Sequence, residues 1–153
     1  MTNTQKHIGE FHITARYKDG REETHVIKNR ITNVALNKFV NILNGTDPDM
    51  EIKYCAVGTD NTAINDNDTT LGNEIFRTQD LSSSQTATGE FTSTFAILDA
   101  EAVGTWAELG IFCGSTATAT ADTGTMLSRV LFNFEKTSLV EVDITRVDKQ
   151  VRG

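Results

Sequence analysis

The chain has 153 residues, 38% of them hydrophobic, and carries 14 Lys and Arg against 21 Asp and Glu, a formal net charge of −7. That length suits one domain with a core of its own. The acidic balance argues against direct nucleic-acid contact, which needs a clustered basic surface, and against contact with an anionic membrane. No stretch approaches the ~18 apolar residues of a membrane helix. Because residues 1–7 lack the apolar run of a signal peptide, we expect a chain made and folded in a cytoplasm.

Residues 8–28 predict a β-hairpin. Apolar and polar residues alternate in its first half, with the period of a half-buried strand. Asp19-Gly20 then supplies a two-residue type I′ turn, because both central residues of that turn need positive φ. In this register Ile13 faces Val26, an apolar pair that supports the hairpin.

Residues 32–43 predict the one helix of the chain. Leu36, Phe39, Val40 and Leu43 fall at i, i+3, i+4 and i+7 and form one apolar stripe. We expect this stripe to be buried on a sheet.

From residue 51 onward the pattern is β. Short apolar runs recur at near-regular spacing, which is typical of a sandwich or barrel. The predicted strands are 52–57, 74–79, 90–98, 105–113, 126–134 and 139–147, and the polar segment 81–89 is interpreted as a loop. We therefore expect a mainly β protein, an antiparallel, jelly-roll-like β-sandwich forming one domain over residues 1–153. The hairpin and the helix, about residues 8–43, are expected to pack on it.

Two long polar loops, 59–70 and 114–125, carry few apolar anchors. Ordering a backbone costs roughly 1–2 kcal/mol per residue, so we expect neighbouring subunits to supply the missing contacts in a symmetric oligomer. The candidate interface residues are Asp60, Asn65, Asp66, Asp68, Thr118, Thr120 and Asp122.

Four charged residues interrupt otherwise apolar strands: Glu74, Arg77, Glu108 and Arg129. A buried charge is costly unless it is paired. We therefore predict structural Glu–Arg pairs between neighbouring strands, with an inter-subunit contact as the alternative.

The segment from Asp60 to Asp68 is rich in side-chain oxygens, a composition that suits Ca²⁺. However, the Gly and the terminal Glu of an EF-hand are misplaced, and Asn and Asp are also ordinary turn residues. His7, His12 and His25 lie in the hairpin, where His12 and His25 are expected to share a face. Two ligands fall short of a metal site. We therefore predict no metal and no cofactor, with Ca²⁺ at the loop from Asp60 to Asp68 as the alternative.

The sequence contains no Gly-x-Ser-x-Gly elbow, no P-loop and no dinucleotide-binding glycine pattern, and we predict no catalytic residue and no enzyme activity. Cys55 and Cys113 each sit in an apolar run. Buried free thiols are the preferred interpretation, with a disulfide as the alternative.

Four short motifs follow one another along the chain. They are A-x-G-T at residues 56–59, L-G-x-E-x-x-R at 71–77, E-x-G-I-F at 108–112 and L-x-R-V-x-F at 127–132. In this order, over about residues 29–136, the chain resembles a widespread group of small bacteriophage virion proteins of the tail-fibre, collar or baseplate type. The extended Thr/Ala/Asp loop after Cys113 departs from the short Gly-rich turn that is common in the group.

The resemblance implies a structural protein of the virion, made in the host cytoplasm, with other phage virion proteins and further copies of itself as partners. It leaves open whether the attachment point is the tail, the baseplate, the collar or the capsid surface. The alternative is a receptor- or glycan-binding tip of a phage fibre, in contact with a host receptor. A sugar-binding face usually presents Trp or Tyr, and the one Trp, Trp106, lies in an apolar strand.

Overall fold

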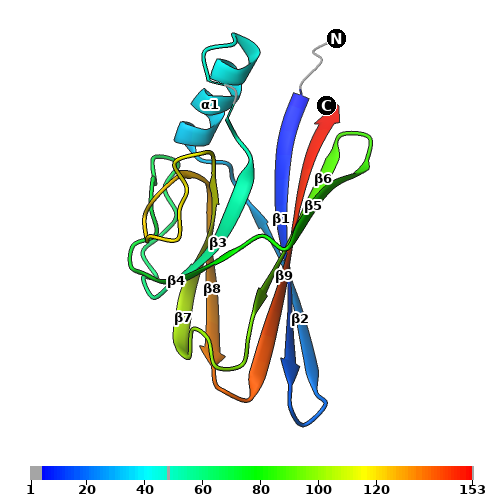
Figure 1. Cartoon of the computed structure of the whole chain (residues 1–153), viewed down its shortest axis with the longest axis vertical. Helices are drawn as coiled ribbons and strands as arrows, with labels where there is room; N and C mark the ends of the chain where they lie inside the picture. Colours follow the sequence, from blue (N-terminus) through cyan, green and yellow to red (C-terminus); the bar gives the residue numbers. More distant parts are fainter. Residues whose placement is uncertain (1–4, 48, 153) are drawn as a thin grey trace.

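The computed structural model describes residues 5–47 and 49–152, so residues 1–4 of the polar N-terminal segment lie outside it. In the described ranges, nine strands form two antiparallel sheets and one helix lies at one end of them (Figure 1). The predicted mainly β sandwich with a single short helix is confirmed.

The elements are β1 Gln5–Tyr17, β2 Glu22–Asn29, α1 Asn33–Leu43, β3 Ile52–Gly58, β4 Glu74–Gln79, β5 Ser82–Ala87, β6 Glu90–Ile97, β7 Gly104–Cys113, β8 Thr125–Lys136 and β9 Val140–Arg152. The five-stranded sheet has the order β2-β1-β9-β6-β5, and the four-stranded sheet has the order β4-β3-β7-β8. The hairpin β1–β2 is therefore part of a sheet and not a unit packed on the sandwich.

The core lies between the two sheets. Alternating positions of the facing strands point inward, as period-2 geometry requires. The core side chains with at most 1% exposure include Phe11, Ile13, Phe95, Ile97, Trp106, Leu109, Ile111, Val142 and Ile144. The indole N–H of Trp106 donates to the carbonyl of Ala102 at 2.7 Å, so this buried polar atom has a partner.

The predicted register of the first hairpin is wrong by one residue. Ile13 faces His25 and not Val26. The reason is the turn, in which Gly20 at φ +93° closes a loop of three residues where two were expected. Since neighbouring side chains point to opposite faces of a sheet, His12 and His25 lie on opposite faces, contrary to the prediction.

Helix α1 starts where the sequence predicts. The hydroxyl of its N-cap residue Thr32 accepts the N–H of Ala35 at 3.2 Å and donates to the carbonyl of Met126 in β8 at 2.6 Å. This residue therefore caps the helix and attaches it to the four-stranded sheet.

The expected burial of the apolar stripe of α1 is wrong for three of its four residues. Ala35 is buried and Phe39 packs against the core. Leu36, Val40 and Leu43 are 45%, 58% and 88% exposed. The helix lies at the end of the sandwich and not across a sheet face, so only a narrow strip of it meets the core.

Strand β5 was predicted to be a loop. It pairs with β6, and all six of its residues are exposed. Between the sheets, β2 contacts β8 and β6 contacts β4, so the strands β2, β1, β9 and β6 lie over β8, β7, β3 and β4. Strand β5 therefore overhangs, and no described strand of the other sheet lies opposite it.

Candidate functional site

The two long polar loops, here residues 59–73 and 114–124, cover the outer face of the four-stranded sheet (Figure 1). Leu71 of the first loop and Ala117 of the second are buried against Ala56, Phe112 and Met126. Strand β7 is thus covered on both faces, which explains why it is buried continuously from its third residue onward.

The first loop is held by a buried carboxylate. Glu108 of β7 has no exposed surface. It accepts the backbone N–H groups of Asp60, Gly72 and Asn73 at 3.2, 3.0 and 2.9 Å. It also accepts Nε of Arg129 at 2.6 Å. These charge-assisted bonds offset the cost of burying the carboxylate and fix both ends of the loop.

Arg129 of β8 extends the same network. Its guanidinium donates to the carbonyl of Asp60 at 3.2 Å and pairs with the carboxylate of Asp68 at 3.3 Å. We call the contacts of Glu108 and Arg129 the first anchor. The Glu108–Arg129 pair spans the neighbouring strands β7 and β8.

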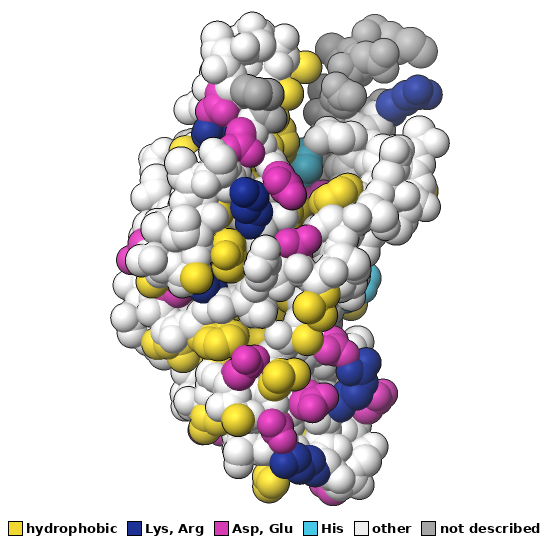
Figure 2. Space-filling view, viewed as in Figure 1, with side chains coloured by type: hydrophobic (Ala, Val, Ile, Leu, Met, Phe, Trp, Pro, Cys, Tyr) yellow, Lys and Arg dark blue, Asp and Glu magenta, His cyan; other side chains and the backbone are white. Residues whose placement is uncertain are grey.

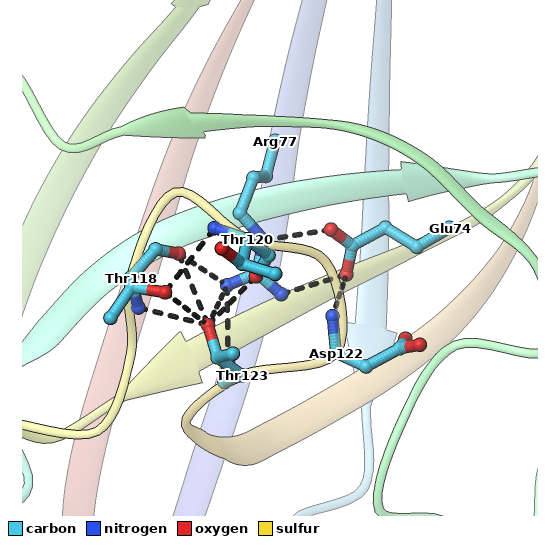
Figure 3. Close-up of polar contacts among 6 residues, drawn as sticks. All are labelled: Glu74, Arg77, Thr118, Thr120, Asp122 and Thr123. Atoms are coloured by element: carbon cyan, nitrogen blue, oxygen red, sulfur yellow. Dashed lines mark hydrogen bonds and ion pairs between the residues drawn. The ribbon is translucent and has the colours of Figure 1, made fainter.

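The second loop has a separate anchor, formed by Glu74 and Arg77 of β4 (Figure 3). Both side chains are buried, and they form two parallel bonds of 2.7 Å. Arg77 also donates to the carbonyls of Thr118 and Thr123 at 2.9 and 3.1 Å, and Glu74 accepts the N–H of Asp122 at 3.2 Å. This second anchor ties the loop to the edge strand of the sheet.

The residues predicted to form an interface take part in contacts within the chain. Asp60 accepts from Thr62, Asp66 pairs with Arg30 at 2.8 Å, and Asp68 belongs to the first anchor. From the sequence, an isolated chain was expected to have little to hold these loops. That expectation is wrong, because the loops are held mainly by buried charged side chains and not by apolar ones. Exposed Asn65, Thr118, Thr120 and Asp122 remain available to a neighbour, and their contact with one stays a prediction.

The four sequence motifs meet at the first and second anchors. A Cβ on Gly58, from A-x-G-T, would overlap the Glu108 carboxylate and would also lie 2.7 Å from the carbonyl oxygen of Asn73. Gly110, from E-x-G-I-F, lies against Leu71, where a Cβ would come within 2.9 Å of a methyl group. Gly58 is therefore required for the close approach of the first loop to the sheet, and Gly110 leaves room for the Leu71 side chain.

The oxygen-rich loop from Asp60 to Asp68 was the candidate for Ca²⁺. Its carboxylates are used by loop turns and by arginines, as described above. The described residues contain no group of three or more His, Cys, Asp or Glu that could hold a metal ion. The histidines are apart: His12 contacts Glu10 at 3.0 Å, and His25 packs edge-on to Phe132.

Both cysteines are free and buried. Burial raises the pKa of Cys55 to about 12 and also raises the pKa of Cys113. These thiols are therefore unreactive at neutral pH.

A third buried ion network was not predicted. Arg146 of β9 has no exposed surface and lies between the sheets. It forms two bonds to Asp148, at 3.1 and 2.8 Å, and donates to Asn29 and Ser128 at 2.5 and 3.0 Å. His7 contacts the same Asp148 carboxylate at 2.9 Å. Among the described residues, every buried side-chain nitrogen and oxygen has a hydrogen-bond partner.

A cleft of about 540 Å³ opens beside this network, between α1 and the β5–β6 hairpin. Figure 2 shows a hollow there, with apolar, acidic and histidine side chains on its walls. His7 and Asp148 line it together with apolar side chains, which are Phe39, Met50, Ile52, Phe91 and Leu127.

Comparisons with protein-family models, with curated protein sequences and with solved structures find no match for this chain. Among the described residues, no helix has the length and apolar character that crossing a membrane requires. The geometry defines an antiparallel β-sandwich with two internally anchored loops on one sheet.

Proposed function

We propose that this protein is a structural subunit of a bacteriophage particle, in the tail, baseplate, collar or capsid surface, and that it acts through protein–protein interfaces. The observation that carries the proposal is the meeting in space of the four motifs that resemble small virion proteins. They lie up to 76 positions apart in the sequence, from residue 56 to residue 132, and supply Gly58, Leu71, Glu74, Arg77, Glu108, Gly110 and Arg129 to the two anchors. Four unrelated short matches would have no reason to share one structural unit.

The internal anchoring of the loops suits an assembly role. Association is more favourable when the surface is ordered beforehand, because less conformational entropy is lost on binding. Two loops held by buried ion pairs give the chain such a surface without any neighbour.

The exposed side of α1 also favours an interface function. Leu36, Val40 and Leu43 form an apolar stripe that the chain does not bury. The one charged residue of the helix, Lys38, is paired with Asp47. Apolar surface that is grouped in this way usually marks a contact with another protein.

The test is incorporation into particles. Particles purified from a lysate of the producing host are analysed by quantitative mass spectrometry and by immunogold microscopy. We expect the chain to copurify in a fixed ratio to the major capsid protein. Recovery of the chain only in the soluble fraction would overturn the proposal.

Variants then test the stripe. Leu36→Ser, Val40→Ser and Leu43→Ser combined should reduce incorporation while the chain still folds. Val26→Ser, at a position 56% exposed on another element, is the matched control and should incorporate normally.

A receptor- or glycan-binding tip is the second candidate, and the apolar cleft beside α1 favours it, since clefts of this size hold small ligands. Against it, Trp106 is fully buried, and Tyr17 and Tyr54 lie under the guanidinium groups of Arg21 and Arg77 at 4.0 and 5.4 Å. A glycan microarray tests it. Binding by the wild type that is lost in Phe91→Ala, a change in the cleft wall, would favour this candidate over the first.

A further inference from the structure

Strand β5 ends the five-stranded sheet with an open edge. Within residues 5–47 and 49–152 it pairs with β6 alone, and all its residues are exposed. The outer edge of such a strand presents unpaired backbone N–H and C=O groups, which are a template for another strand.

The other three edges are protected. Strand β2 carries Glu22, Glu23 and Lys28 and lies along β8, which also contacts α1. Strand β4 carries the charged pair Glu74 and Arg77, which holds the loop 114–124 over the adjoining face of the sheet. Strand β5, with the sequence Ser-Ser-Ser-Gln-Thr-Ala, has neither charge nor proline. Its register shift lies near the turn, after Gln85.

Strand β5 also lacks the side-chain burial that usually stabilises a strand. It overhangs the four-stranded sheet and buries no side chain, and a two-stranded overhang has little stability of its own. Hydroxyl pairs to β6 hold it, between Ser82 and Thr94 at 2.7 Å and between Thr86 and Thr92 at 3.0 Å. A second strand on its outer edge would supply the missing ladder of hydrogen bonds.

We propose that the occupant of this edge is β5 of a second copy of the chain, antiparallel across a two-fold axis perpendicular to the sheet. The two five-stranded sheets then become one continuous sheet. In the register that centres on the strand, Ser84 faces Ser84 of the other copy and Ser83 faces Gln85. Asp80 then faces Thr88, so no like charges meet.

Charge permits a second copy at this edge more readily than elsewhere on the surface. A chain with net charge −7 repels another copy over most of its surface, and the repulsion is least where the strand is uncharged. A single strand pair buries less than the ~800 Å² per partner of a stable dimer, so isolated copies associate weakly. Many copies held in one particle would strengthen the contact through their high effective concentration. The inference thus deepens the proposed assembly function and rests on it for its biological setting.

The test is sedimentation of the isolated full-length chain over a series of concentrations. The weight-average mass of the wild type should rise from 16.8 kDa toward that of a dimer. Ser84→Lys and Ser84→Glu should each abolish the rise, because like charges would face each other. An equimolar mixture of the two variants should restore it. Thr24→Lys, an exposed change on the protected edge strand β2, is the control and should associate as the wild type does.

A wild type that stays monomeric at every concentration, or Ser84 variants that associate unchanged, would overturn the inference. If Ser84→Lys were lost from particles while the isolated wild type stayed monomeric, the edge would bind another protein, which also overturns it. Self-association through Ser84 in a chain that is absent from particles would refute the virion function and leave the β5 contact standing.

Discussion

Glu108 is a carboxylate with no exposed surface that receives three backbone N–H groups and one arginine. In Glu108→Gln, the amide NH₂ would face an N–H group whose hydrogen bond the carboxylate now accepts. Arg129 would lose its fully buried carboxylate partner and keep the part-exposed Asp68. Breaking a buried ion pair in this way costs about 3–5 kcal/mol. We expect a loss of this size in the free energy of unfolding, measured by urea denaturation.

Glu141→Gln, at an exposed position of β9, is the matched control and should leave the denaturation midpoint unchanged. A Glu108→Gln chain as stable as this control would show that the first anchor contributes nothing to the fold.

The sequence indicates which charged residues need a buried partner better than it indicates which residue that partner is. Glu108 and Arg129 could be selected from the sequence, because a charge inside an apolar strand needs a partner. Only the pairing of β7 with β8 shows that the two residues lie side by side. Arg146 and Asp148 were missed, although they share the inward parity of Val142 and Ile144 in β9. Continuing that alternation by two more steps would have placed both charges between the sheets.

At the scale of elements, each long loop has its own anchor, so the two loops should respond to different substitutions. Lysine keeps the charge of arginine but cannot make its parallel bonds. Arg77→Lys should therefore speed hydrogen exchange at residues 114–124 and leave 59–73 unchanged. Arg129→Lys should have the converse effect. Hydrogen exchange read by mass spectrometry measures both loops in one experiment.

Each variant is the control of the other. Equal acceleration of both loops in both variants would show that the covering layer opens as one unit and that the two anchors are not independent.

Elements with an apolar periodicity were predicted, and elements without one were not. The helix and most strands have such a pattern, and they are found within a few residues of the predicted bounds. Strand β5 buries nothing, so its sequence has no alternation to read. The stripe of α1 was read correctly as apolar, but periodicity does not reveal whether a sheet lies beneath it.

For the whole molecule, the pKa shifts predict loss of stability in acid. The pKa values of six carboxyl groups are held below their ordinary range, those of Glu10, Asp47, Asp49, Asp60, Asp99 and Asp148. A lowered pKa contributes stability above the pKa of the unfolded chain and loses it as the pH falls through the folded value. We expect the free energy of unfolding to be nearly constant above about pH 5 and to fall below about pH 4.

Asp148→Asn tests the buried member of this group. Burial raises the pKa of Asp148, but the hydrogen bond from His7 and the charge of Arg146 outweigh it and lower the pKa overall. The variant should be less stable than the wild type at pH 7 and should approach it in acid. Urea unfolding at a series of pH values measures this. A curve parallel to the wild type would contradict the prediction.

The place of β9 has a consequence for how the chain folds. It lies between β1 and β6, and its pairing joins Gln5 to Arg152. Until β9 is in place, the five-stranded sheet consists of two separate hairpins, β1–β2 and β5–β6. Contacts this distant in sequence form slowly, because a long chain must close before they are made. During synthesis the sheet therefore stays open until its last strand has left the ribosome, and a chain cut short before residue 140 would be left with two unjoined hairpins.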